Sequence, residues 1–350
     1  MSGQKLAAEC IASLRADLTA AKPRFPWLAA DLQTLRNTLV TPHIDMSVYG
    51  EQVIPIRFRD GDETLCYAHA AIPGPTSTPA PAGDAAAFHK DCSIIIIHGL
   101  GGDARGSAVR YLTARLLASG FPAVRINLRG APAVYHLASS IGHAGKTADL
   151  YDILSGLQAS LGRRRWGLIG ISLGGNLTAK ALGDGALSDF DIVAAMTICA
   201  PLDMQAASDR ILEPRNWLYE KYLLRDLKNA VLRTAMGEAW KAKARGARTV
   251  YQFDDTVTGP FHGYGTAANY YGRVSAGPVL KKISIPTLLL AAANDPWIPA
   301  ESFNPYASAA NAPAQILVTP HGGHVGYHFT GTKEPAYCSV AARWFTAVTS

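Results

Sequence analysis

The chain has 350 residues, of which 48% are hydrophobic and 17% charged, a composition typical of folded globular proteins and not of disordered chains. Its formal net charge of +6 comes without a long basic run, which argues against a nucleic-acid-binding function. The five cysteines are scattered and form no Cys-x-x-Cys motif, so we expect neither a disulfide framework nor a structural zinc site.

The first 90 residues predict helices followed by one hairpin. Residues 1–40 have a helical pattern, interrupted near residues 25–27, and their charged side chains leave no apolar core for a signal peptide. Since no apolar span of about 20 residues occurs anywhere, we expect a cytoplasmic protein without a transmembrane segment. Residues 53–58 and 64–69 flank an Asp-Gly turn and predict a β-hairpin, and the Pro- and Ala-rich residues 72–88 predict a surface loop.

From residue 92 onward, predicted strands alternate with predicted helices. The strands are expected at residues 92–97, 123–128, 166–170, 192–198, 287–292 and 315–318, and the helices at about 109–117, 145–160, 174–182 and 340–348. Such alternation predicts an α/β fold whose mostly parallel sheet has helices on both faces. Residues 201–277 interrupt it with helical, aromatic-rich sequence, which predicts a helical cap inserted into a single domain of residues 1–350.

The sharpest chemical motif is Gly170-Ile171-Ser172-Leu173-Gly174, between an apolar strand and a helix. In that context Gly-x-Ser-x-Gly predicts a nucleophile elbow, a strained turn that exposes the serine hydroxyl. The small residues are needed because the turn brings the strand and helix backbones close together. Ser172 is therefore the predicted nucleophile.

A serine nucleophile needs a base and an acid that orients the base. Asp295 follows the predicted strand 287–292, and His324 follows the last predicted strand within a glycine-rich turn. The order Ser, Asp, His is the one found in this kind of fold. Asp203 remains an alternative acid, and His321 an alternative base.

The developing oxyanion of an acyl-transfer reaction needs backbone N–H donors. His98-Gly99-Leu100-Gly101-Gly102 follows the first long apolar strand, so we assign the two donors to Leu100 and Leu173. The His98 ring is expected only to order this glycine turn.

Two rival sites involve these same segments. Residues 99–104 also fit Gly-x-Gly-x-x-Ala, the pattern of a dinucleotide-binding turn, and Arg129 could then meet an NADP phosphate. That hypothesis leaves Ser172 and His324 unexplained. A metal site at His321, His324 and His328 lacks the glutamate and the helix of the zinc-protease motif.

Taken together, these motifs resemble the YheT-like branch of the α/β-hydrolases, which is related to the ABHD lipid hydrolases and the yeast ethyl-ester synthases. The matching segments span nearly the whole chain in the family's order and are Asp31–Leu35, His98–Gly102, Leu128–Gly130, Ser172–Asn176, Phe253–Asp255, His262–Tyr264, Asn294–Pro296 and His321–Gly326. The resemblance implies an eight-stranded sheet, carboxylester hydrolysis on short to medium acyl chains, and the triad Ser172, Asp295 and His324. The family usually has histidine where Asp31 stands, a departure expected to be remote from the chemistry.

We therefore expect a serine hydrolase that cleaves carboxylic esters through an acyl-enzyme, without a metal or organic cofactor. The partner would be a small-molecule ester, and the aromatic cap suggests a hydrophobic acyl chain. An acyltransferase, a thioesterase or peptidase, and a non-enzymatic interaction protein with the same fold stay open as alternatives. Asp254 and Asp255 are expected to tie the cap to the core.

Overall fold

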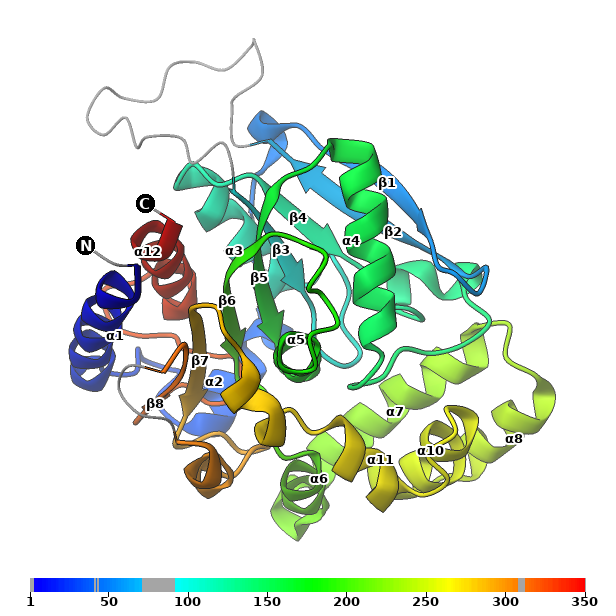
Figure 1. Ribbon diagram of the computed structural model, residues 1–350. Helices are drawn as coiled ribbons and strands as arrows, with labels where there is room; N and C mark the ends of the chain where they lie inside the picture. Colours follow the sequence, from blue (N-terminus) through cyan, green and yellow to red (C-terminus); the bar gives the residue numbers. More distant parts are fainter. Residues whose placement is uncertain (1–2, 41, 43, 71–91, 308–311, 350) are drawn as a thin grey trace.

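The computed structural model describes residues 3–40, 42, 44–70, 92–307 and 312–349. Within them, one eight-stranded sheet has the order β1-β2-β4-β3-β5-β6-β7-β8 (Figure 1). Its strands are Gln52–Arg57 (β1), Glu63–His69 (β2), Cys92–Ile97 (β3), Ala123–Ile126 (β4), Arg165–Ile171 (β5), Ile192–Ile198 (β6), Thr287–Ala292 (β7) and Ala314–Thr319 (β8). The β1–β2 and β2–β4 pairs are antiparallel and the others parallel, so the predicted mostly parallel sheet is confirmed.

Helices cover both faces of this sheet. On one face lie α3 (Ser107–Ala118) and α12 (Ala336–Thr349), and α1 (Gly3–Ala20) packs against α12 and β8. On the opposite face lie α4 (Thr147–Leu161) and α5 (Leu173–Gly183) (Figure 1). Because both faces are covered, all six residues of β3 are buried, which explains the unbroken apolar run in the sequence.

Most predicted elements agree with the structure within a few residues. The hairpin is present, with the backbone N–H of Phe58 donating to the carbonyl of Asp62 across its turn. Strand β4 ends at Ile126, two residues earlier than predicted, because the backbone N–H of Leu128 donates to the His98 ring instead of continuing the sheet. The predicted surface loop 72–88 lies outside the described residues.

Between β6 and β7 the chain forms a group of helices with its own apolar cluster. They are α6 (Met204–Leu212), α7 (Trp217–Arg233), α8 (Glu238–Gly246), α9 (Val250–Phe253), α10 (Gly259–Phe261) and α11 (Ala267–Val274), with a π-helical turn at Asp254–Thr258. Leu223, Val231 and Phe253 lie in their shared core. In Figure 1 these helices form the lower layer of the molecule, apart from the helices that flank the sheet.

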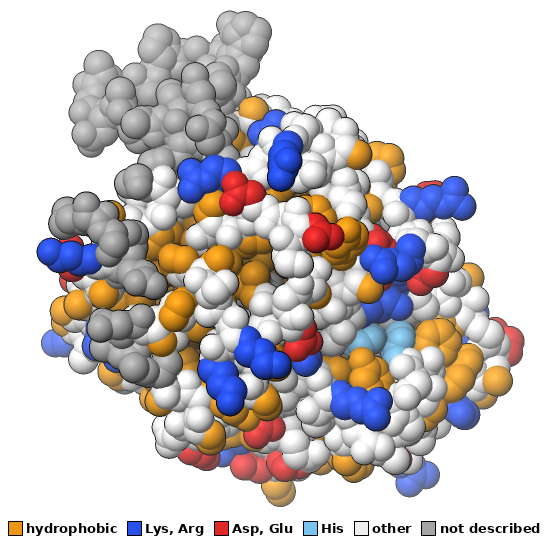
Figure 2. All heavy atoms as spheres, in the orientation of Figure 1, with side chains coloured by type: hydrophobic (Ala, Val, Ile, Leu, Met, Phe, Trp, Pro, Cys, Tyr) orange, Lys and Arg blue, Asp and Glu red, His pale blue; other side chains and the backbone are white. Residues whose placement is uncertain are grey.

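The described helices contain no membrane span, and the face drawn in Figure 2 shows no large basic patch. No described helix combines the length and the apolar character that crossing a bilayer requires. On the face drawn in Figure 2, Lys and Arg side chains are scattered singly, with Asp and Glu among them. All five cysteines lie in described positions and are free thiols.

A buried guanidinium ties the hairpin to the centre of the fold. The Arg129 side chain is about 1% exposed and donates two hydrogen bonds of 2.9 Å to Asp149 on α4. It also bonds to Asp60 and Asp62 in the hairpin turn, while its guanidinium carbon lies 4.1 Å from the ring centre of Phe58. Arg129 is thus saturated by carboxylates of the protein itself.

Replacing Arg129 by methionine is expected to lower the free energy of unfolding by roughly 3–5 kcal/mol, because Asp62 and Asp149 would remain buried without their cation. Urea denaturation followed by circular dichroism would measure the loss. The matched control is Arg163→Met, at an exposed arginine, for which we expect a change within about 0.5 kcal/mol. Equal stabilities of the two variants would contradict a structural role for the Arg129 cluster.

Candidate active site

Ser172 occupies a strained turn between β5 and α5. Its φ of 51° and ψ of −121° lie outside the regions that non-glycine residues usually adopt. Gly174 is needed at this turn, because a Cβ there would lie 2.3 Å from the carbonyl oxygen of His98. The backbone of the elbow is therefore the one that the Gly-x-Ser-x-Gly motif predicts.

The three residues predicted as a triad form one chain of hydrogen bonds. His324 Nε2 lies 2.9 Å from Ser172 Oγ, and His324 Nδ1 lies 2.8 Å from Asp295 Oδ2. The other carboxylate oxygen of Asp295 accepts from the backbone N–H groups of Trp297 and Ile298, at 2.8 and 3.2 Å. Since a carboxylate faces Nδ1, the proton belongs on that nitrogen, and Nε2 presents its lone pair to the serine hydroxyl.

The loop that holds His324 is supported by an N-terminal helix, α2 (Ala30–Leu39), which the sequence did not connect to the site. Thr34 Oγ1 accepts from the backbone N–H of His324 at 2.8 Å. Gln33 and Asn37 bond to the backbone of the same loop, at His328 and Val325. The Asp31–Leu35 motif was the available signal, but only the fold shows what it contacts.

Two intervening side chains, Tyr219 and Trp297, connect position 31 to the triad, and the expectation that it is remote from the chemistry stays a prediction. The Asp31 carboxylate accepts from the Tyr219 hydroxyl at 3.0 Å, and the Tyr219 ring packs edge-on against Trp297 with centroids 5.4 Å apart. Trp297 in turn stacks on the His324 ring at 4.2 Å. The indole face therefore packs flat against the imidazole ring of His324 and helps to fix its orientation. Sequence reasoning missed Trp297, although it stands two residues after Asp295.

The glycine loop after β3 lies directly against Ser172. A Cβ on Gly99 would be 3.0 Å from Ser172 Cβ, and both Leu100 and Leu173 line the same cavity as Ser172. His98 holds this loop: its Nε2 accepts from the backbone N–H of Leu128, so its Nδ1 carries the proton and donates to the carbonyl of Gly99. Burial lowers the pKa of His98, which keeps the ring neutral in this role. The structural role expected for His98 is thus present.

The alternative acid and base occupy other positions. The Asp203 side chain caps α6 by accepting from the backbone N–H of Ala206 at 3.0 Å. Of the two histidines in the loop, His324 bonds to both Ser172 and Asp295, whereas no hydrogen bond joins His321 to either residue.

The dinucleotide hypothesis meets two obstacles. A Cβ on Gly101 would lie 2.5 Å from a carboxylate oxygen of Asp226, so an acidic side chain fills the space that a pyrophosphate would need. Arg129, which would meet an NADP phosphate, is already bound by three carboxylates.

Among the described residues, Cys199, Asp295 and His324 bring ligand atoms within 4.8 Å of one another. Two of them, however, already bond to each other. The Cys199 thiol is fully buried, and this burial raises its pKa well above the ordinary value, so the thiolate that a metal would need is disfavoured. This donor set fits the hydrogen-bonded triad better than a metal ion.

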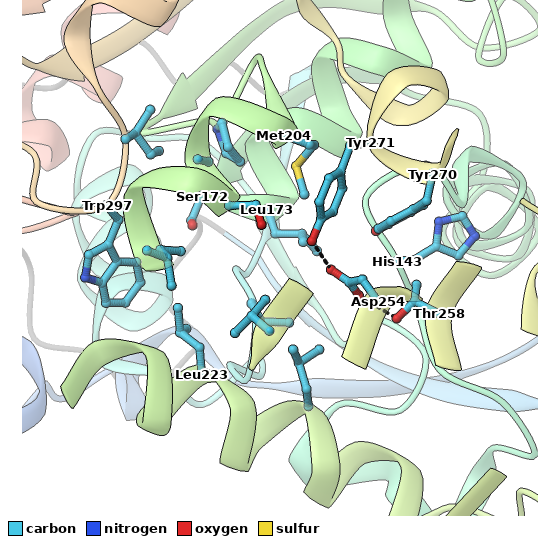
Figure 3. Close-up of a pocket in the computed structure, with 18 of the residues that line it drawn as sticks. His143, Ser172, Leu173, Met204, Leu223, Asp254, Thr258, Tyr270, Tyr271 and Trp297 are labelled. Carbon is cyan, nitrogen blue, oxygen red and sulfur yellow. Dashed lines mark hydrogen bonds between the residues drawn. The ribbon is translucent and has the colours of Figure 1, made fainter. Parts of the chain in front are cut away.

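A cavity of about 90 Å³ opens onto Ser172 and His324 (Figure 3). Aliphatic side chains of α6 and α7 line one part of it, among them Ile211, Leu223 and Leu227. Polar side chains line another part and are listed here: His143, Ser208, Asp254, Thr258, Tyr270 and Tyr271. The cavity therefore offers both an apolar and a polar wall next to the serine.

The expectation that Asp254 and Asp255 tie the cap to the core is wrong. Asp254 accepts from the hydroxyls of Thr258 at 2.6 Å and Tyr271 at 2.7 Å, and Asp255 accepts from the backbone N–H of Ala267. All three partners belong to residues 201–277, so these carboxyl groups join segments of this helical region to one another. Burial raises the pKa of Asp254 to about 6, against the effect of its two hydrogen bonds.

This raised pKa predicts that the free energy of unfolding depends on pH. In the unfolded chain the pKa of Asp254 is about 3.9, so the folded chain holds this proton more tightly. The free energy of unfolding therefore falls as pH rises from about 4 through about 6. The variant Asp254→Asn lacks this titration. Between pH 5 and 7.5 we expect its free energy of unfolding to rise by roughly 1–1.5 kcal/mol relative to the unmodified chain, as measured by urea denaturation. Parallel pH profiles of the two proteins would contradict the assignment.

Comparison with known proteins places this geometry in a family. The model of the alpha/beta hydrolase fold matches residues 93–330, more than half of the chain. YheT of Escherichia coli (strain K12), named as an esterase, is 31% identical over 69% of this chain and 72% of its own length. Phospholipase ABHD3 of Mus musculus is 26% identical over 69% of this chain. The monoacylglycerol lipase of Saccharomyces cerevisiae is 27% identical over 67% of this chain. The match spans less than two thirds of the latter two relatives, 60% and 54%.

Solved structures show the same architecture. The esterase Pf2001 of Pyrococcus furiosus superposes with a TM-score of 0.55 over 89% of this chain and 96% of its own, at 14% sequence identity, a likeness that concerns the fold alone. The family match and the identity to YheT establish the relationship. The chain belongs to the α/β-hydrolase fold family, in the branch that contains YheT and the ABHD proteins.

Proposed function

We propose that the chain is a serine esterase that hydrolyses carboxylic esters through an acyl-enzyme on Ser172. The observation that supports this most is the hydrogen-bonded chain Ser172–His324–Asp295, with distances of 2.9 and 2.8 Å. Relatives named as an esterase, a phospholipase and a monoacylglycerol lipase point to the same reaction class. No other part of the described chain offers a nucleophile and a base in such contact within a cavity.

In the proposed reaction, His324 Nε2 takes the Ser172 proton as the hydroxyl oxygen attacks the ester carbonyl. The carbonyl oxygen becomes an oxyanion, and the backbone N–H groups of Leu100 and Leu173 are proposed to stabilise it. Asp295 then stabilises the imidazolium, and the stacked Trp297 helps to fix the orientation of its ring. His324 returns the proton to the leaving alcohol, and water attacks the acyl-enzyme by the same route.

We further propose that residues 201–277 act as a cap that shapes the substrate site. Their side chains line the cavity together with Ser172 and His324. The cavity volume of about 90 Å³ is small beside the 300–1,000 Å³ of typical ligand pockets. In this conformation the site favours a short acyl chain over a long one.

The test is a panel of p-nitrophenyl esters with acyl chains from C2 to C16, assayed with the unmodified chain and with Ser172→Ala. We expect kcat/KM to be highest for short and medium chains, and the variant to lose a factor of roughly 10⁴ to 10⁶ in kcat, as substitutions of a triad residue do. The control is Ser188→Ala, at an exposed serine of the same chain, which should retain full activity.

A fluorophosphonate probe gives an independent readout, since it labels only an activated serine. Labelling of the unmodified chain and of Ser188→Ala, but not of Ser172→Ala, is the expected result. Undiminished turnover in Ser172→Ala, or absence of labelling in the unmodified chain, would overturn the proposal.

A further inference from the structure

The polar wall of the cavity contains a carboxyl group without a cation. Asp254 is buried, and its hydrogen-bond partners among the described residues are the neutral hydroxyls of Thr258 and Tyr271. Two hydrogen bonds leave part of the acceptor capacity of a carboxyl group unused. Figure 3 shows Asp254 between Thr258 and Tyr271, on the side of the cavity away from Trp297.

A second polar group on this wall is unpaired. The Ser208 side chain comes from α6, is 5% exposed, and lines the cavity. Its hydroxyl makes no hydrogen bond of acceptable geometry to any described residue, although it lies beside the Tyr271 hydroxyl. A buried hydroxyl without a partner costs about 1–3 kcal/mol, a cost that a ligand group could remove.

The charges around this wall distinguish between possible ligand groups. His143 lines the cavity, and its ring lies 4.3 Å from that of His262. Burial lowers the pKa of both rings, and the positive charge of Lys146 adds to this effect. A ligand ammonium would add a second cation near Lys146, and it could not accept a hydrogen bond from Ser208. A ligand hydroxyl can donate to Asp254 and accept from Ser208 at the same time.

We propose that Ser208, Asp254 and Tyr271 form a subsite that binds a hydroxyl group of the substrate ester. This inference rests on the proposed esterase function and specifies its substrate class. The substrate would place its hydrocarbon part against Ile211, Leu223 and Leu227, and its hydroxyl-bearing part against the polar wall. A site built to bond a hydroxyl discriminates against an analogue in which a methyl group replaces it, because the polar groups of the site then stay unpaired.

The experiment uses two pairs of esters in which a methyl group replaces a hydroxyl. The pair 2-hydroxyethyl butyrate and propyl butyrate varies the alcohol, and the pair ethyl 3-hydroxybutyrate and ethyl 3-methylbutyrate varies the acyl chain. We expect a higher kcat/KM for the hydroxylated member of one pair, and the responding pair identifies the part of the ester that meets the subsite.

The test variant is Ser208→Ala, which removes the Ser208 hydroxyl and leaves the hydrogen bond from Tyr271 to Asp254 in place. It should lower kcat/KM for the preferred hydroxylated ester by roughly 2- to 10-fold, the effect of one neutral hydrogen bond, and change that of its methyl analogue less than twofold. The control is Thr256→Ala, on the same π-helical turn as Asp254, whose hydroxyl donates to Gln252 and does not line the cavity. Thr256→Ala should leave the ratio within each pair unchanged.

The outcomes separate the subsite from the reaction. If all esters are hydrolysed through Ser172 without a preference for a hydroxyl, or if Ser208→Ala affects both members of a pair equally, the subsite is wrong and the esterase stands. If no ester is hydrolysed, the esterase proposal fails. Ligand-observed NMR titration of Ser172→Ala with the same ester pairs then still tests the subsite: it is overturned if the added change Ser208→Ala does not weaken binding of the hydroxylated ester.

Discussion

The contact between Ser172 and His324 joins two loops that lie 152 residues apart in the chain, and the arrangement of the site depends on it. It can form because β5 and β8 lie in the parallel part of the sheet, so the segments that follow them emerge at the same edge. Separate sets of interactions hold Ser172 and His324 in place. The strained turn and its glycines hold the serine, whereas Asp295, Thr34 and Trp297 hold the imidazole.

The N-terminal helix α2 has a larger part in this arrangement than its position in the sequence suggests. Gln33, Thr34 and Asn37, from successive parts of one short helix, all bond to the loop that carries His324. At the start of the same helix, Asp31 bonds to Tyr219 of the cap. This helix therefore links the histidine loop to the helical region 201–277.

The interior of the cap explains why the site is not uniformly apolar. Asp254 lies on a π-helical turn, a local irregularity that is frequent at functional sites, and it lines the cavity. Keeping an uncompensated acid buried is unfavourable, and its pKa of about 6 reflects that cost. Buried acidic residues with a raised pKa are often found at binding or catalytic sites.

The sequence by itself determined the order of the strands and helices along the chain, the mostly parallel sheet, and the candidate residues Ser172, Asp295 and His324. It could do so because periodicity, glycine spacing and chain order are local properties that follow from backbone geometry. Only the tertiary structure decided which of the nearby histidines bonds to Ser172 and that Asp203 caps a helix. It also corrected the role of Asp254 and disclosed Trp297 and the bond between Asp31 and Tyr219, because contacts between side chains from distant segments depend on how the elements pack, and no local pattern encodes them.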